Sequence, residues 1–427
     1  MLFTNIDVLR ADGTLLRGRT VAVRDGRIAY IGKSVPTADW GEVVAGKDRL
    51  LMPGFYNAHT HAAMTLLRGY GEDLPLDRWL RERIFPAEAG MTGDDVYWGT
   101  LLGIAEMLST GTVSFSDMYF FPDRVAQAVL SSGIKANVGC SVVAQGDKPL
   151  RSLPACGEMK GLLEALKELK TDRLRIDAAP HAEYTTTPRL LSELAEFSAE
   201  YGIRVQTHLS ETREEQLACV GRHGKTPAAV MRDAGLFGRP VTAAHCVWLT
   251  ESDREILAEH GVTVAHCPQS NLKLGSGIAP VELLRRQGIP VAVGTDSAAS
   301  NNNLNLLEEV RTAALLARGI SRDAGALPAS EALYMATRAG ALAQGREDCG
   351  DIRVGYRADL LVVNRRAPSM MPGHQPAADV LFGMGSDALE MTVVDGRVLY
   401  REGEFPTLDA EKIRYRVRRC VKALLAR

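Results

Sequence analysis

The histidines of this chain are concentrated where short apolar segments end. Six of the nine do so, as does one aspartate: His59, His61, His181, His208, His245, His266 and Asp296. Alternate residues of an extended segment project to one side, so His59 and His61 can face one metal ion. His208 and Asp296 would complete a site of three nitrogens and one carboxylate with room for a water, as in hydrolytic metal centres. Alone, an H-x-H pair is more often a surface or hydrogen-bonded core feature, so this prediction depends on the other segment ends.

Two further residues could handle protons at such a centre. Glu211 lies three residues after His208 in QTHLSET, and a glutamate beside an activated water can shuttle protons. Glu211 would also be favourable simply as an acid at a helix N-terminus. His245 could hydrogen-bond the water, or pack beneath the rim of the fold. For His266 the sequence favours a structural hydrogen bond in the loop that follows it.

These residues need a scaffold that gathers strand ends, and the chain predicts one. From residue 50 short apolar segments alternate with stretches of helical periodicity, for example 188–201 and 251–259. The strand candidates are 50–52, 113–115, 136–139, 175–179, 204–207, 241–244, 263–265 and 291–294. Eight such units favour a closed (β/α)₈ TIM-like barrel, whose active site lies at the carboxyl ends of the strands. An open doubly wound sheet would give the same alternation.

The two ends of the chain predict a second, smaller domain. Strand-like pieces occur at 3–9, 20–24 and 28–31 and return at 358–363, 391–394 and 397–400. Pairing them in one small β-sandwich is the simplest way to bury both sets. The predicted domains are residues 1–49 and 350–408 for the sandwich, 50–349 for the barrel and 409–427 for a C-terminal helix.

The predicted C-terminal helix is basic and amphipathic. One face carries Ile413, Val417, Val421 and Leu424. We expect this face to dock on the barrel or on a second subunit of a homo-oligomer rather than to touch a membrane.

Composition excludes several classes of partner. With 50 basic and 52 acidic side chains the net charge is -2, too balanced for a protein that tracks nucleic acid. No apolar run approaches the ~18 residues of a membrane-spanning helix. The first residues lack the basic start and continuous apolar block of a signal peptide, so we expect a cytoplasmic protein. The seven cysteines lie far apart without a C-x-x-C pair, which argues against disulfides and zinc knuckles.

Taken together, the segment-end motifs resemble those of the amidohydrolase superfamily. They read PGFYNAHTHAAMTLLRG, APHAEYTTT, QTHLSETREEQ, AAHCVWLT, AHCPQSNLKLGSG and GTDSAASNNNLNLLEE. Within that superfamily they are similar to the 5′-methylthioadenosine/S-adenosylhomocysteine deaminases and the related triazine hydrolases, over nearly the whole chain. The resemblance implies one divalent metal ion per subunit. The expected ion is Zn²⁺, with Fe²⁺ or Mn²⁺ as alternatives. Its ligands would be His59, His61, His208 and Asp296. The carboxylated lysine of binuclear relatives has no counterpart here, so a second metal is not expected.

The same resemblance implies a small nucleoside substrate: S-adenosylhomocysteine, 5′-methylthioadenosine, 5′-deoxyadenosine or adenosine. Hydrolysis would give the inosine derivative and ammonia. Glu211 would donate a proton to ring N1, Asp296 would accept the proton of the attacking water, and His245 would orient that water. Glu88 and His181 match positions that hold the ribose hydroxyls and the substrate, although Glu88 could instead be a solvated loop acid.

One departure concerns the amino-acid tail of S-adenosylhomocysteine. Many family members carry an arginine just after the third strand, where this chain has Gly139-Cys140. Arg151 could supply the replacement charge, because a guanidinium suits a carboxylate, or it could be a surface arginine.

Two other interpretations remain open. The same metal site could deaminate guanine, cytosine or a pterin, or hydrolyse an s-triazine, although the pair Glu88 and His181 argues for a ribosyl group. The chain could also be a non-catalytic scaffold, but burying unpaired polar side chains around an empty hole would be costly.

Overall fold

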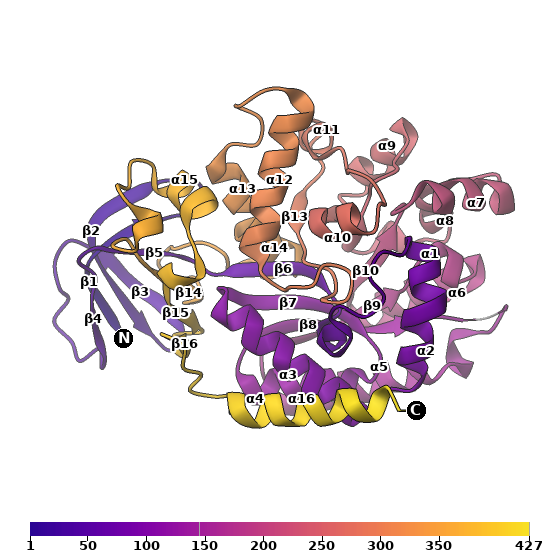
Figure 1. Cartoon of the computed structure of the whole chain (residues 1–427), viewed down its shortest axis with the longest axis horizontal. Coiled ribbons are helices and arrows are strands. Elements are labelled where there is room, and N and C mark those ends of the chain that lie inside the picture. Colours follow the sequence, from indigo (N-terminus) through magenta and orange to yellow (C-terminus); the bar gives the residue numbers. More distant parts are fainter. Residues whose placement is uncertain (145, 427) are drawn as a thin grey trace.

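The centre of the fold is a closed parallel barrel (Figure 1). The computed structural model describes residues 1–144 and 146–426, with only the backbone at 386. The barrel strands, in order around it, are β6 (Phe55–Thr60), β7 (Thr112–Tyr119), β8 (Lys135–Val142), β9 (Leu174–Pro180), β10 (Arg204–Leu209), β11 (Val241–His245), β12 (Thr263–His266) and β13 (Val291–Val293). A parallel bridge between Thr60 and Asp296 joins the last strand to the first. The barrel is therefore closed, which excludes the open doubly wound sheet.

Barrel closure depends on a glycine beside the first strand. A Cβ atom at Gly294 would lie 2.8 Å from the backbone nitrogen and oxygen of His59. Two residues later, the backbone nitrogen of Asp296 donates to the carbonyl oxygen of His59 at 3.0 Å. The close approach of these two segments thus sets Asp296 beside the H-x-H pair.

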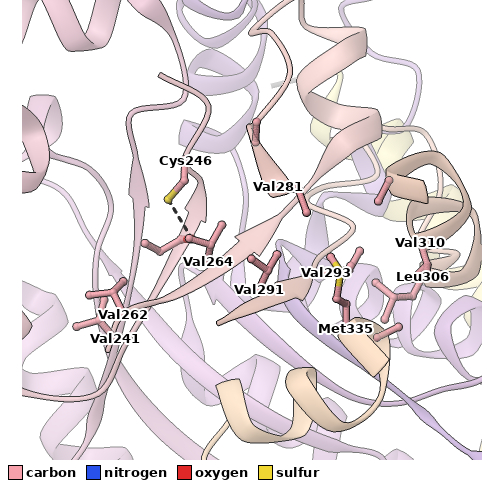
Figure 2. Close-up of a cluster of buried hydrophobic side chains, with 14 of the residues drawn as sticks. Val241, Cys246, Val262, Val264, Val281, Val291, Val293, Leu306, Val310 and Met335 are labelled. Carbon is pink, nitrogen blue, oxygen red and sulfur yellow. Dashed lines mark hydrogen bonds between the residues drawn. The ribbon is translucent and has the colours of Figure 1, made fainter. Parts of the chain in front are cut away.

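Helices surround the barrel, and the predicted spans 188–201 and 251–259 are confirmed. Between the first and last barrel strands, two short helices that are described below are followed by α3 (Gly93–Ser109), α4 (Pro122–Ser132), α5 (Pro154–Leu169), α6 (Pro188–Tyr201), α7 (Arg213–His223), α8 (Pro227–Asp233), α9 (Glu251–Glu259), α10 (Pro268–Lys273) and α11 (Val281–Arg286). After the last strand come α12 (Leu306–Ser321), α13 (Ala329–Ala336) and α14 (Arg338–Ala343). Figure 2 shows how valines of β11 to β13, such as Val264 and Val293, pack with Leu306 and Met335 into a continuous core.

The two chain termini share one sheet, as expected. Its strands are β1 (Leu2–Leu9), β2 (Leu15–Arg24), β3 (Arg27–Gly32), β4 (Val43–Ala45), β5 (Arg49–Pro53), β14 (Leu360–Asn364), β15 (Leu389–Val394) and β16 (Arg397–Arg401). Hydrogen bonding links all of them in one sheet, and side chains from both chain ends share one buried core, among them Phe3, Val21, Leu360 and Val393. A short helix, α15 (Pro376–Ala378), lies between β14 and β15.

The assignment of 50–52 as the first barrel strand is wrong. This segment is β5, which pairs with β1 and β14 in the terminal sheet. The first barrel strand is β6, which begins at Phe55 and leads directly to His59 and His61. A short buried apolar run fits either sheet equally well, so its pattern did not distinguish them.

The C-terminal helix docks on the barrel of its own chain. It is α16 (Ala410–Leu424), and it packs along α3 (Figure 1). Ile413 and Leu424 are buried there, and Arg416 bonds Asp94 at 2.9 Å. Residue 427, the end of the predicted helix, lies outside the described residues. Because this apolar face is used within the chain, the expected homo-oligomer would need another surface.

One segment at the carboxyl end of the barrel was not predicted. After a 3-10 turn, η1 (Ala62–Leu67), the chain forms α1 (Leu76–Trp79), the π-helical turn η2 (Leu80–Ile84) and α2 (Phe85–Ala89). Figure 1 shows α1 and α2 at the end of the barrel opposite the terminal sheet. None of the described helices is long and apolar enough to span a bilayer.

Candidate metal centre and active site

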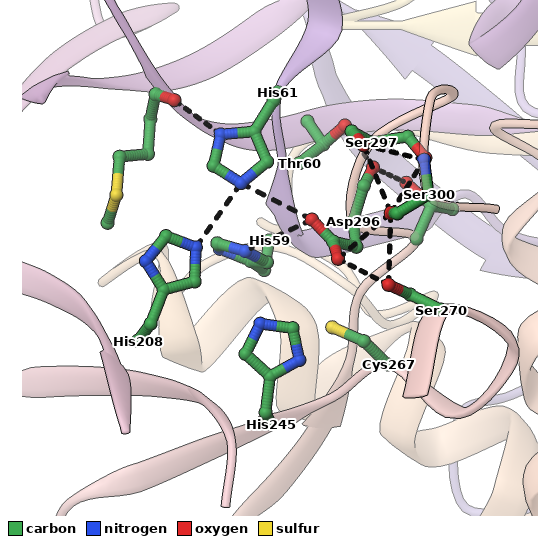
Figure 3. Close-up of polar contacts among 12 residues, drawn as sticks. His59, Thr60, His61, His208, His245, Cys267, Ser270, Asp296, Ser297 and Ser300 are labelled. Atoms are coloured by element: carbon green, nitrogen blue, oxygen red, sulfur yellow. Dashed lines mark hydrogen bonds and ion pairs between the residues drawn. The ribbon is translucent and has the colours of Figure 1, made fainter. Parts of the chain in front are cut away.

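Four predicted metal ligands converge at the carboxyl end of the barrel (Figure 3). The Nε2 atoms of His59 and His61 lie 3.6 and 3.3 Å from Oδ1 of Asp296. His208 Nε2 lies 3.3 Å from His61 Nε2. The donor atoms form two groups, and within each group they lie within 4.8 Å of one another. One group comes from His59, His61 and Asp296, and the other from His59, His208 and His245. The structure thus brings the predicted ligands together in one buried cluster.

Hydrogen bonds fix which nitrogen of the ligand histidines faces this centre. His61 Nδ1 donates to the carbonyl oxygen of Met118 at 2.6 Å, and His208 Nδ1 donates to that of His181 at 2.7 Å. Their Nε2 lone pairs therefore face each other, which is unfavourable without a cation between them. His59 Nε2 is buried and has no hydrogen-bond partner among the described residues. Three imidazole nitrogens and a carboxylate suit Zn²⁺, so these residues fit a metal site.

The charges in the cluster require a positive charge at its centre. Burial opposes ionisation of Asp296, but the imidazoles of His59 and His61 beside its carboxylate hold its pKa well below the usual range. Burial also works against protonation of His61, yet Asp296 raises the pKa of His61 to about 9. Burial lowers the pKa of His59 to about 4. A proton on His61 or a metal ion can therefore balance Asp296, and a divalent ion would satisfy all the donors at once.

The second oxygen of Asp296 is held by two serines. Ser270 Oγ donates to Oδ2 at 2.5 Å and Ser300 Oγ at 3.1 Å (Figure 3). Because Oδ1 faces the histidines, the carboxylate is fixed in one orientation. Such outer hydrogen bonds commonly set the orientation of a ligating carboxylate.

Glu211 and His245 face the same centre. Glu211 is 6% exposed, its Oε1 accepts from Ser276 Oγ at 3.1 Å, and its Oε2 lies 3.7 Å from His245 Nε2. Burial raises the pKa of Glu211, which favours the protonated form that can donate. His245 Nδ1 donates to Oδ1 of Asn271 at 2.9 Å, so its Nε2 remains an acceptor on the side of the cleft.

The backbone bends sharply where these side chains leave their strands. The φ angle is +48° at Ser210, +72° at His245 and +56° at Asp296. Residues other than glycine rarely adopt this left-handed region, and each such residue costs about 1–3 kcal/mol. At Ser210 the bend is held by Glu215, whose carboxylate accepts from the backbone nitrogens of Ser210 and Glu211 at 2.9 and 2.7 Å. The strained residues thus lie at, or directly before, the candidate site residues Glu211, His245 and Asp296.

Above the cluster lies a cleft with about 650 Å³ of space free of protein atoms, part of it open to solvent. Glu88 of α2 and His181, which follows β9, line it together with Glu211 and His245. Burial raises the pKa of Glu88 to about 7, against the opposing influence of Tyr119 and His61. Burial lowers the pKa of His181 to about 3, so this imidazole is neutral, and its Nδ1 lies 3.1 Å from Thr185 Oγ1.

Other residues singled out from the sequence do not reach this cleft. Arg151 is exposed in η3 (Leu150–Ser152) and is not among the lining residues. Cys140 points away, with Sγ 3.3 Å from Glu158 Oε2 on α5, whereas its neighbour Ser141 lines the cleft. His266 does not make the expected loop hydrogen bond. Its buried Nδ1 has no partner among the described residues, and its ring lines an apolar pocket beside α11 and α12.

Sequence reasoning missed the residues that orient the catalytic groups. These are Glu215, Ser270, Asn271, Ser276 and Ser300. Glu215 lies in the first turn of α7, where Thr212 accepts from its backbone nitrogen at 3.1 Å, so a helix-capping pattern could have drawn attention to it. The others lie in segments that follow β12 and β13 and have no local pattern of their own.

Comparison with known proteins agrees with this geometry. Residues 50–399 match the model of the amidohydrolase family. A protein of Dictyoglomus thermophilum named 5-methylthioadenosine/S-adenosylhomocysteine deaminase is 44% identical over 374 residues, 87% of each chain. A 5′-deoxyadenosine deaminase of Methanothermobacter thermautotrophicus is 38% identical over 413 residues, 97% of this chain and 96% of the relative.

A solved structure is similar over the full length. The adenosine deaminase of Xanthomonas campestris with bound zinc is 34% identical, with a TM-score of 0.92 over 100% of this chain and 98% of that one. The match to the family model covers most of the chain and includes every ligand of the donor cluster. The chain therefore belongs to the amidohydrolase family.

Proposed function

We propose that this protein is a metal-dependent hydrolytic deaminase that converts an adenosine derivative into the inosine derivative and ammonia. Its substrates belong to the class of S-adenosylhomocysteine, 5′-methylthioadenosine, 5′-deoxyadenosine and adenosine. The observation that carries the proposal is the placement of the metal donor cluster, Glu211 and His245 around one cleft. Relatives named as deaminases of such nucleosides support the same reaction.

The cofactor is one divalent metal ion, and Zn²⁺ is the ion that we propose. His59, His61, His208 and Asp296 would hold it. When bound, it supplies Lewis acidity that makes water a nucleophile at neutral pH. The zinc in the similar adenosine deaminase supports this assignment.

The chain's own residues then manage the protons. Glu211, buried and with its pKa raised, donates to ring N1 as water adds to C6 of the purine. His245 orients that water through its acceptor Nε2, because its Nδ1 is committed to Asn271. Asp296 accepts one proton of the water and passes it to the amino group, so the C6–N bond breaks with loss of ammonia. The proton left on the C6 hydroxyl returns to Glu211, which gives the carbonyl of the product and restores the acid. Each proton transfer of this kind contributes about 10²–10⁴ in rate.

The ribose lies between this centre and the cleft mouth. Glu88 accepts from its hydroxyls, and neutral His181 contacts the substrate through Nε2. Thr185 Oγ1 donates to the carbonyl oxygen of Ala182 at 3.2 Å, so it accepts from His181 Nδ1 and leaves Nε2 free. We place the enzyme in the cytoplasm, which its seven unpaired cysteines support.

The direct test is ammonia release by the zinc-loaded protein given each of the four nucleosides. Glu211→Gln should lower kcat by about 10²–10⁴, because an amide cannot supply the proton. Glu214→Gln, an exposed neighbour, is the matched control and should retain activity.

Two results would contradict the proposal. One is no turnover of any of the four substrates by protein that contains metal, which would direct attention to guanine, cytosine, pterins and triazines. The other is a Glu211→Gln variant that is as active as the parent protein. Protein that binds no metal would instead favour the scaffold interpretation.

A further inference from the structure

The mouth of the cleft is apolar. Leu76, Trp79, Leu80, Ile84 and Phe85 of the α1–α2 segment line it, and face residues at the ends of β7 and β8, Phe120 and Val143. Several of these side chains remain open to solvent: Phe85 is 42% exposed, Phe120 38% and Val143 41%. Large apolar side chains gathered at the mouth of a cleft are typical of a binding surface rather than of a bare wall.

Four charged residues of the same segment form ion pairs on its outer face. Arg78 pairs with Glu82, and Arg81 with Asp77, each at 2.7 Å on the exposed face. Among the residues that the structure describes, no lysine or arginine lines the cleft. Its charged side chains apart from the histidines are the acids Glu88, Glu211 and Asp296. The segment is thus amphipathic, and apart from Glu88 the face that it presents to the cleft is apolar.

The position of the reaction centre decides which part of a substrate meets this surface. The purine must lie with C6 at the donor cluster on the cleft floor, and the ribose must lie near Glu88 and His181. The 5′ substituent then extends toward the mouth, among Trp79, Phe85 and Val143. A methylthio group would remove apolar surface from water there, whereas a carboxylate would lose its water without gaining a cationic partner.

We propose that the cleft selects adenosine derivatives with a small, uncharged 5′ substituent, methylthio or hydrogen, and discriminates against the zwitterionic tail of S-adenosylhomocysteine. This inference rests on the proposed deaminase function and narrows it. The apolar wall disfavours the 5′ hydroxyl of adenosine more weakly, because such pockets reject an added hydroxyl by at most about 10²-fold.

The first test is the ratio of kcat/KM values for the zinc-loaded enzyme. We expect S-adenosylhomocysteine to be at least about 100-fold poorer than 5′-methylthioadenosine, since its carboxylate would lie against the apolar mouth without a cationic partner. Calorimetry with the zinc-loaded Glu211→Gln protein should show the same order in binding, independently of turnover. A ratio within tenfold would overturn this inference but leave the deaminase function intact. No turnover of any nucleoside would overturn the proposed function itself.

A gain-of-function variant tests the electrostatic cause. Phe85→Arg would place a cation at the exposed part of the mouth, so it should improve kcat/KM for S-adenosylhomocysteine by about tenfold or more relative to 5′-methylthioadenosine. Phe85→Gln, which removes the ring without adding charge, should not give this gain. Arg81→Gln, on the outer face, should leave both values unchanged. If Phe85→Arg discriminates as strongly as the parent enzyme, the missing cation is not the cause.

Discussion

Asn271 determines how His245 can act. Its Oδ1 accepts from His245 Nδ1 at 2.9 Å, which leaves Nε2 as an acceptor for the water that we propose attacks the substrate. Asn271→Leu removes the acceptor, so we expect kcat to fall about 10–100-fold, the usual effect of losing such an orienting bond. Steady-state kinetics and metal analysis of the purified protein would measure this, with metal content unchanged.

Asn271→Asp is the informative partner of this variant. An aspartate retains an acceptor for His245 Nδ1, so it should preserve more activity than leucine does. The exposed Lys273→Gln on the same helix serves as a control. Equal losses in the leucine and aspartate variants would show that Asn271 acts through packing and not through the hydrogen bond.

The facing lone pairs of His61 and His208 make the protein's stability depend on metal. Removal of the ion should lower Tm, and added Zn²⁺ should restore it, because a ligand at 1,000 times its Kd stabilises the folded state by about 4 kcal/mol. His208→Gln should lose most of this zinc-dependent shift, whereas exposed His374→Gln should keep it. Differential scanning calorimetry in chelator and in zinc is the measurement. A Tm that is independent of zinc would contradict the metal assignment.

The sequence was enough to propose the residues that act directly, whereas the residues that orient them could not be predicted. His59, His61, His208 and Asp296 each lie at or just after the carboxyl end of a barrel strand, and a barrel gathers such positions at one end. Ser270 and Asn271 reach the site only because α10 packs beside the end of β13 and β11 in three dimensions. No spacing in the sequence encodes that contact.

At the scale of elements, the first turn of α7 positions Glu211. The Glu215 carboxylate accepts from the backbone nitrogens of Ser210 and Glu211 and so holds the left-handed bend that aims Glu211. Glu215→Ala should lower kcat at least about tenfold while KM and metal content change little, since substrate contacts remain. Glu215→Gln keeps one acceptor and should recover part of the loss. The result that would refute this role is an unchanged kcat in Glu215→Ala.

The elements themselves were largely predictable. Seven of the barrel strands could be predicted because each is a short, buried apolar run. Helices such as α6 and α9 could be predicted because each buries one apolar face, which gives a helical period. β5 was assigned to the wrong sheet, since only its partners β1 and β14 distinguish it. The α1–α2 segment was missed because its π-helical turn interrupts the regular helical period.

At the scale of the whole molecule, a buried ionic cluster joins the barrel to the terminal sheet. Lys135 at the start of β8 is 1% exposed, and its Nζ lies 2.8 and 2.6 Å from the two oxygens of Asp359. Asp395 lies 2.7 Å from the same nitrogen, and the Tyr56 hydroxyl donates to Asp359. Tyr56 comes from β6 and Lys135 from β8, whereas Asp359 directly precedes β14 and Asp395 lies in the turn between β15 and β16.

Lys135→Met should therefore destabilise the protein by about 3–5 kcal/mol, because it leaves carboxylates buried without their cation. Lys167→Met, which breaks an exposed pair with Glu164, should cost less than about 1 kcal/mol. Urea unfolding at neutral pH would compare the two. Similar losses in both variants would contradict a special role for the buried cluster.

The same cluster predicts how stability depends on pH. Burial opposes ionisation of Asp359, but Lys135 lowers its pKa below the ordinary value. Its contribution is therefore present above the unfolded pKa of about 4 and is lost as pH falls through the lower folded value. The difference in unfolding free energy between the parent protein and Lys135→Met should shrink below about pH 4. A difference that stays constant down to pH 3 would rule this out.

The junction between β5 and β6 connects the terminal sheet directly to the strand that carries His59. Only Gly54 separates β5, in that sheet, from β6, which carries His59. A Cβ atom at Gly54 would lie 2.3 Å from the Val113 side chain of β7, so the junction has no room for a larger residue. For protein engineering, the terminal sheet is thus not an exchangeable module. A chimera that grafts a foreign sheet onto this barrel would have to reproduce the register of β5, because a shift there would displace the proposed metal ligands His59 and His61.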